Sequence, residues 1–215
     1  MLISAVMRLA MLGATMAIVA GCHHPAGDGS GEPIRPLAPF AVQRLIVTPT
    51  GHVRATDSLG WTHQMAGARA AGRQLDSSIV VALEARGLAS RWILPAELTR
   101  VFERNRTYAT DPYQLAVEQV RSAAFKVGAR YGEPLSSQLR TMIALHEDAR
   151  FVLVPADLHF ERDGAGGRAV VRLVLLDPRF AEARWVGDVS GVSAQTPVLA
   201  LSSAADRVAD LFVAP

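Results

Sequence analysis

The sequence predicts a mixed α/β fold in which helices pack on a mixed sheet of about five strands. Three stretches near the end of the chain alternate apolar and polar residues with the period of a strand. Several earlier stretches, and one after them, repeat apolar residues with the period of a helix. Hydrophobic residues make up 50% of the chain, which is enough to fill one ordinary core. Strands mixed with helices in this order indicate a sheet covered by helices.

The first elements follow a polar, proline-rich segment. Residues 40–48 are apolar and β-branched, and the consecutive apolar residues 45–47 place this first strand in the centre of the sheet. Residues 66–86 carry their alanine, leucine and isoleucine side chains on one face of a helix, which ends at Gly87. Residues 91–94 predict a short second strand.

The middle of the chain predicts three helices. Residues 95–104 form the first. The second begins at Asp111 as its cap, with a proline in the first turn and Gln114 placed for a capping box, and runs to about residue 124. The third starts at Pro134 and ends near residue 146.

The last third predicts a three-strand antiparallel meander closed by a helix. The strands are residues 150–161, 168–176 and 183–192, the first two are joined by the glycine-rich turn 163–167, and the helix covers 197–212. Period two predicts the following inward-facing side chains on the first strand: Val152, Val154, Ala156, Leu158 and Phe160.

The beginning of the chain has the pattern of an export signal. Arg8 precedes an uncharged apolar run of residues 9–20, which is too short to span a bilayer. Val19-Ala20-Gly21-Cys22 resembles the lipobox of bacterial lipoproteins, in which the signal peptide is cut before a lipid-bearing cysteine. Cys22 is the only cysteine and has no disulfide partner within the chain. We therefore expect a signal peptide over residues 1–21, cleavage between Gly21 and Cys22, and lipid on Cys22.

Two alternatives remain open at this end of the chain. An ordinary signal peptide followed by an incidental cysteine fits the same residues. Translation could also start at Met7, directly before the basic residue, instead of Met1.

The lipobox predicts a cellular location and a tether between the lipid and the domain. Residues 22–39 are rich in glycine and proline and form a flexible tether, followed by a single domain over residues 40–215. The residue after the cysteine is His23 rather than the aspartate that retains lipoproteins at the inner membrane in enterobacteria. We therefore expect an outer-membrane protein, held by a palmitate-type lipid anchor, whose domain faces the periplasm. The pair His23-His24 is a poor metal site.

The charges argue against a nucleic-acid partner. The chain has 22 Lys and Arg against 20 Asp and Glu, and Lys126 is its only lysine. Basic and acidic residues alternate along the chain, so no basic stripe is available to neutralise a phosphate backbone.

The strands "ARFVLVPADL", "VVRLVLLDPR" and "ARWVGDVSG", with a glycine-rich hairpin between the first two, resemble a group of envelope domains. The group comprises the α/β domains of the curli-secretion lipoprotein, of lipoprotein activators of penicillin-binding proteins, and of the N-terminal part of TolB. Asp177 and Trp185 match its pattern, whereas residues 180–182 replace its turn glycine. The resemblance implies a non-enzymatic accessory lipoprotein that binds an envelope protein partner in assembly, transport or cell-wall regulation.

The polar residues predict no enzyme, no cofactor and no metal. His146, Glu147 and Asp148 are consecutive, so on a helix they point in different directions and fit a solvated helix end. Asp157, His159 and Glu161 share one face of a strand. That face is either the solvent side of the meander or the binding surface of a ligand-binding protein or hydrolase.

Aromatic residues near predicted loops are a second candidate for contact with a partner or glycan, although packing in the core is their commoner role. They are Trp61, Trp92, Tyr108, Tyr113 and Tyr131.

Overall fold

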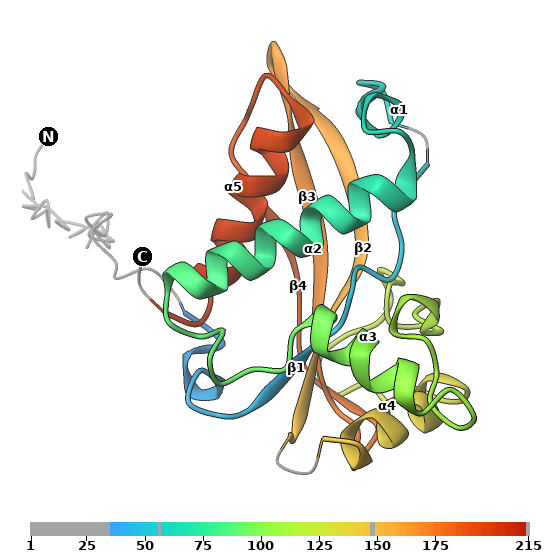
Figure 1. Cartoon of the computed structure of the whole chain (residues 1–215). Coiled ribbons are helices and arrows are strands. Elements are labelled where there is room, and N and C mark those ends of the chain that lie inside the picture. The colour runs from blue at the N-terminus through green and yellow to red at the C-terminus, as the bar shows by residue number, and fades with distance from the viewer. Residues whose placement is uncertain (1–34, 56, 147–148, 214–215) are drawn as a thin grey trace, which may run out of the picture. The chain divides into compact units, whose positions relative to one another are not determined.

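The computed structural model describes residues 35–55, 57–146 and 149–213 (Figure 1). The lipobox, Cys22 and most of the predicted tether lie outside these residues.

The core of the domain is one sheet of four strands in the order β1-β2-β3-β4. The strands are β1 (Leu45–Val47), β2 (Phe151–Asp163), β3 (Gly166–Asp177) and β4 (Glu182–Ser190). β1 runs parallel to β2, and β2, β3 and β4 form an antiparallel meander. The predicted mixed α/β fold with a C-terminal meander is therefore confirmed, with four strands instead of about five.

The missing fifth strand is the one predicted at residues 91–94. This segment makes only a single parallel bridge to β1. In that bridge the Ile93 N–H donates to Leu45 O at 2.8 Å, and the Val47 N–H donates to Ile93 O at 2.9 Å. The helix α3 (Pro95–Arg104) begins two residues later, at a proline that has no N–H for a ladder. β1 is therefore the edge strand of the four, with only the Ile93 bridge on its outer side, and the expected position in the centre of the sheet is wrong. β1 covers three residues of the expected strand 40–48, and the 3-10 helix η1 (Ala38–Phe40) precedes it.

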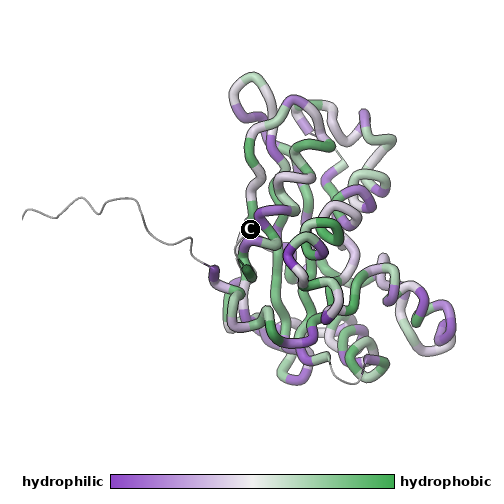
Figure 2. The backbone as a smooth tube through the Cα atoms, turned by 60° about the vertical axis from the view of Figure 1, so that its left-hand side comes forward, coloured by the Kyte–Doolittle hydropathy of each residue, from purple (hydrophilic) through white to green (hydrophobic). Residues whose placement is uncertain are grey.

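Helices cover both faces of the sheet. One face packs against α2 (Ala68–Ala85) and α5 (Pro197–Asp210), which also pack against each other (Figure 1). The other face packs against α3, α4 (Leu135–Ala144) and the irregular segment 115–131. A short helix, α1 (Trp61–Gln64), precedes α2. The hydrophobic residues follow the strands at the centre of the domain, and polar residues gather on the outer turns of the helices (Figure 2).

The predicted helix ends agree with the structure for α2 and α3. Gly87 has φ of +72°, a left-handed conformation that glycine adopts without strain, and its N–H closes the end of α2 on Glu84 O. The α3 bounds are those expected from the sequence.

The helix predicted from Asp111 to about residue 124 is wrong. Asp111 does cap a turn, since its carboxylate accepts from the Tyr113 N–H at 2.9 Å, but only the 3-10 helix η2 (Pro112–Gln114) follows. The Arg172 guanidinium, which projects from β3, donates to the carbonyls of Val120, Ser122 and Phe125. A side chain from the sheet thus takes carbonyl groups that a helix would use internally.

The predicted row of inward side chains on β2 is wrong in its second half. A β-bulge interrupts the pairing of β2 with β3 between Pro155 and Asp157. Val152, Val154 and Ala156 belong to the core on the α3 and α4 side. Leu158 and Phe160 belong to the core on the α2 and α5 side, because the extra residue restarts the alternation.

The Arg172 contacts predict a large stability effect. Arg172→Ala should lower the free energy of unfolding in urea by about 3 kcal/mol, because it leaves buried carbonyls without a donor. Arg184→Ala is the matched control, since Arg184 makes only a part-exposed ion pair with Glu182 at 3.5 Å; it should cost about 0.5 kcal/mol or less. Equal losses in the two variants would show that Arg172 does not hold the 115–131 segment.

Candidate functional site

The 50–54 segment, which leaves the end of β1, positions the polar groups of the domain. It continues along β2 beside the bulge, where the Gly51 N–H donates to Pro155 O and the Leu158 N–H donates to His52 O, at 2.8 and 2.9 Å. On its other side it approaches α2 at Gly72, where an added Cβ would lie 3.3 Å from the Val53 side chain. Two groups of polar side chains meet at this segment.

The first group contains the three residues expected from the alternation of β2. Nδ1 of His159 lies 3.5 Å from Oδ2 of Asp157, and its Nε2 lies 3.1 Å from Oε1 of Glu161. The predicted shared face is therefore confirmed for Asp157, His159 and Glu161. The bulge leaves this prediction intact, because it precedes all three residues.

Basic residues from other segments complete this group. Nε of Arg54 lies 3.0 Å from Oδ2 of Asp157, and Nη2 of Arg168 lies 3.0 Å from Oε2 of Glu161. His52 adds a longer contact, with its Nε2 3.9 Å from Oδ1 of Asp157. The charged cluster is defined by these six residues: His52, Arg54, Asp157, His159, Glu161 and Arg168.

The charged cluster shifts the pKa values of its members. Although burial raises it, contacts with His159 and Arg54 hold the pKa of Asp157 below its usual value. Asp157 raises the pKa of His159 against the effect of burial, and Glu161 adds to this effect. Arg168, followed by His159, lowers the pKa of Glu161. Opposite charges thus stabilise one another, and the arrangement fastens the 50–54 segment to β2.

The expected solvent face is wrong at its first residue. Asp157 is only 4% exposed, because Arg54 and His159 lie over it. Both acids of this cluster are paired with arginines, although Nδ1 of His159 is buried without a hydrogen-bond partner among the described residues.

The second group lines an open cleft of about 580 Å³ between residues 50–53, the first half of α2 and η2. This Asp76 cleft has charged or polar side chains from all three walls: His52, Arg69, Arg73, Asp76, Asp111, Tyr113 and Gln114. Its size falls within the range of small-molecule sites, and none of these residues except His52 belongs to the charged cluster.

Asp76 is the buried group of this cleft. Its Oδ1 accepts from the Thr50 N–H at 2.7 Å and from Thr50 Oγ1 at 2.6 Å, whereas Oδ2 is buried and has no hydrogen-bond partner among the described residues. Burial raises the pKa of Asp76 to about 6, against the two bonds from Thr50. Burial and the charge of Asp76 also raise the pKa of Tyr113, which lines the same cleft.

Sequence reasoning missed Asp76. The available signal was an aspartate within the apolar stripe of the helix, between Leu75 and Ile79, both of which are buried in α2. Asp76 accepts a hydrogen bond from Thr50 and interacts electrostatically with Tyr113. Both residues are distant from it in sequence, so helical periodicity could not identify them as its neighbours.

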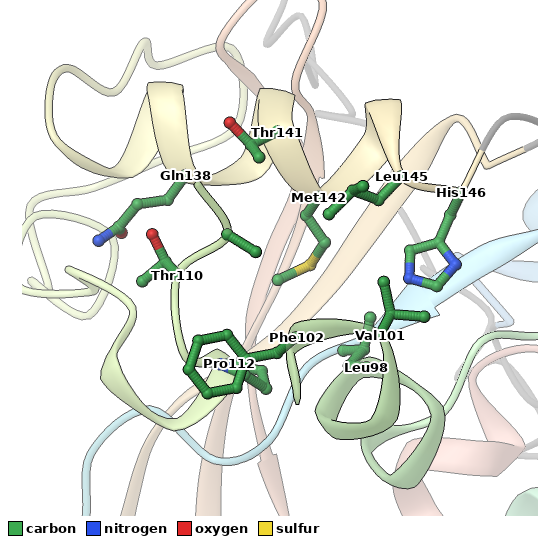
Figure 3. Close-up of a pocket in the computed structure, with 11 residues that line it drawn as sticks. Leu98, Val101, Phe102, Thr110, Pro112, Gln138, Thr141, Met142, Leu145 and His146 are labelled. Atoms are coloured by element: carbon green, nitrogen blue, oxygen red, sulfur yellow. The ribbon is translucent and has the colours of Figure 1, made fainter. Parts of the chain in front are cut away.

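A small cavity between α3 and α4 is a packing gap. It has a volume of about 20 Å³ and is lined mainly by apolar side chains such as Leu98, Phe102 and Met142, with His146 at one end (Figure 3). It has room for about one water molecule.

The helix end at His146 was expected to be solvated, and this is wrong at His146 itself. His146 is 7% exposed, and burial lowers its pKa. Glu147 and Asp148 lie outside the described residues.

The aromatic candidates divide between core and surface. Trp61, Trp92 and Tyr131 are buried. Tyr108 and Tyr113 are exposed, and only Tyr113 of these two lines the Asp76 cleft.

The described part of the chain has neither a helix suited to cross a bilayer nor a cluster suited to bind a metal. None of its helices is both long and apolar enough to cross a bilayer. Within the same residues, no group of three or more His, Cys, Asp or Glu side chains is arranged to hold a metal ion.

Comparison with known proteins does not assign this chain to a family. No protein-family model and no curated protein matches the chain. Among solved structures it is similar to a PelC dodecamer from Paraburkholderia phytofirmans, with 18% identity, a TM-score of 0.34, and coverage of 80% of this chain and 88% of that one. A variant of the same dodecamer in another crystal form has 16% identity, a TM-score of 0.35, and coverage of 80% and 91%. Both similarities are too low to carry an argument about function.

The raised pKa of Asp76 predicts a pH-dependent gain of stability in Asp76→Asn. The folded protein binds this proton more tightly than the unfolded chain, so the wild type loses stability as the pH rises from 3.8 to about 6. Above pH 6 the asparagine variant should be more stable by up to about 3 kcal/mol, and the gain should disappear towards pH 4. Chemical unfolding across this range measures it. Glu84→Gln, an exposed change on the same helix, is the control; a gain independent of pH would contradict the prediction.

The charged cluster predicts a linked titration. Asp157→Asn should lower the pKa of His159, because it removes the carboxylate that contributes most to raising that pKa. NMR titration of the histidine ring protons measures the change. Asp163→Asn, at the end of the same strand, should leave this pKa unchanged, and an identical titration in wild type and Asp157→Asn would refute the assignment.

Proposed function

We propose that this protein is a lipid-anchored accessory protein of the cell envelope that acts by binding a protein partner and is not an enzyme. The lipid on Cys22 holds it at the outer membrane, with the domain in the periplasm. The observation that carries the proposal is the sequence Val19-Ala20-Gly21-Cys22 after an apolar run, in a chain with no other cysteine.

The composition of the chain supports a protein positioned by its anchor. The predicted tether, which is rich in glycine and proline, precedes a domain that has its own two-sided core. The domain begins before residue 40, because Leu37 is fully buried in its core and its N–H donates to Leu211 O. The resemblance to the α/β domains of envelope lipoproteins points to accessory work in assembly, transport or cell-wall regulation. The partner binds the domain, and the tether sets how far from the membrane this occurs.

A ligand-binding role is the second candidate. The sequence pointed to the face of Asp157, His159 and Glu161, and these side chains do lie together. Their carboxylates are already paired with Arg54 and Arg168, however, whereas Oδ2 of Asp76 in the neighbouring cleft has no hydrogen-bond partner among the described residues. The cleft is therefore the better location for this role.

The anchor is tested by replacing the lipidated residue. In cells supplied with labelled palmitate, the wild type should carry the label and sediment with outer membranes, whereas Cys22→Ser should lose the label and leave the membrane fraction. His23→Asp is the matched control: it should keep the label and, in an enterobacterial host, move to the inner membrane. Unlabelled wild-type protein would refute the lipoprotein assignment.

The partner is tested by cross-linking in the native cell, followed by pull-down of the wild type and of Cys22→Ser. A defined envelope protein should be recovered with the anchored form and depleted at least severalfold with the unanchored form, because the anchor raises the local concentration of the two proteins. Recovery of no defined protein would count against the accessory role.

A further inference from the structure

The Asp76 cleft presents two kinds of unpaired charge on one helix face. Arg69, Arg73 and Asp76 are spaced four and three residues apart on α2, so they lie along the same side of the helix, and all three line the cleft. No ion pair joins either arginine to Asp76 or to any other carboxylate in the described part of the chain.

The buried carboxylate needs a donor. Asp76 is 6% exposed, and within the described part of the chain its Oδ2 has no hydrogen-bond partner, although Oδ1 accepts two hydrogen bonds from Thr50. A buried, half-satisfied carboxylate costs stability, and its charged form is the less stable one. A positive group placed against Oδ2 would remove both costs.

The exposed rim of the cleft carries positive charges, which could bind an anionic group. The guanidinium groups of Arg69 and Arg73 are exposed, and such groups bind carboxylates through paired hydrogen bonds. Asp111, on the opposite wall, accepts from the Tyr113 N–H and from Gln114 and adds a second negative group. The lining therefore has two positive and two negative side chains, which suits a ligand that carries both charges.

We propose that the Asp76 cleft binds a small zwitterion of the amino-acid or short-peptide class, with its carboxylate on Arg69 and Arg73 and its ammonium group on Asp76. The volume of about 580 Å³ accommodates a dipeptide. Gly72 keeps the cleft in shape, because it lets the wall of residues 50–53 lie directly against α2. This site is independent of the lipid anchor and of the protein partner.

Three matched probes test the proposal on the full-length protein by ligand-detected saturation-transfer NMR at about pH 7.5, where Asp76 is ionised. Glycylglycine carries both charges, N-acetylglycylglycine lacks the ammonium group, and glycylglycine amide lacks the carboxylate. Glycylglycine should bind saturably and roughly tenfold more tightly than either blocked probe, since each of them loses one charged contact.

Two variants assign the charges to residues. Asp76→Asn keeps an acceptor for Thr50 and places an amide group at the unpartnered position, so it should weaken glycylglycine roughly tenfold and leave N-acetylglycylglycine unchanged. Arg73→Gln should weaken glycylglycine and N-acetylglycylglycine but not the amide. Glu84→Gln on α2 and Arg207→Gln on α5 are the controls, and neither should change binding.

The outcomes are distinct. Equal binding of glycylglycine and N-acetylglycylglycine would overturn the proposal, because it would mean that an anion alone occupies the arginines. Absence of saturable glycylglycine binding would also overturn it. Asp76→Asn should remain folded, since it removes a buried charge, so its loss of binding would support the assignment to Asp76.

Discussion

Between Pro155 and Asp157, β2 has one residue more than its partner β3, and the alternation of its side chains restarts there. Before the bulge, both faces of β2 are apolar and lie between two cores. After it, the α2 and α5 face keeps Leu158 and Phe160, while the other face turns polar. The bulge also gives the 50–54 segment its place, because Pro155 O and the Leu158 N–H pair with that segment.

Two polar networks follow from that placement, and they differ in whether their carboxylates are paired with arginines. The charged cluster joins Arg54 to Asp157 and Arg168 to Glu161, with His159 between the two acids, so its charges are matched within the chain. These paired charges hold the 50–54 segment against β2. The Asp76 network stops at Thr50 and leaves one carboxylate oxygen unpartnered. The first network therefore positions the segment that forms one wall of the Asp76 cleft.

The elements that could be predicted from the sequence are those set by residues close together in the chain. The α3 helix, the end of α2 at Gly87 and the three-strand meander each follow from residues within one element. The helix expected after Asp111 failed because Arg172, about 50 positions later in the chain, binds the carbonyls of that segment. The face of Asp157, His159 and Glu161 was predictable from period two, but Arg54 and Thr50 enter the sites through tertiary contacts that no spacing reveals.

A neutral residue in place of Asp76 would make the folded protein more stable. Asp76 lies in the apolar stripe of α2 beside Leu75, and a neutral residue that accepted from Thr50 would avoid the cost of the charge. A carboxylate at this position carries that cost at neutral pH. Functional sites are where such costs are commonly retained, because a charge that is unsatisfied in the free protein can be satisfied by a ligand. Asp157 differs from Asp76 in this respect, since its partners are already in place within the chain.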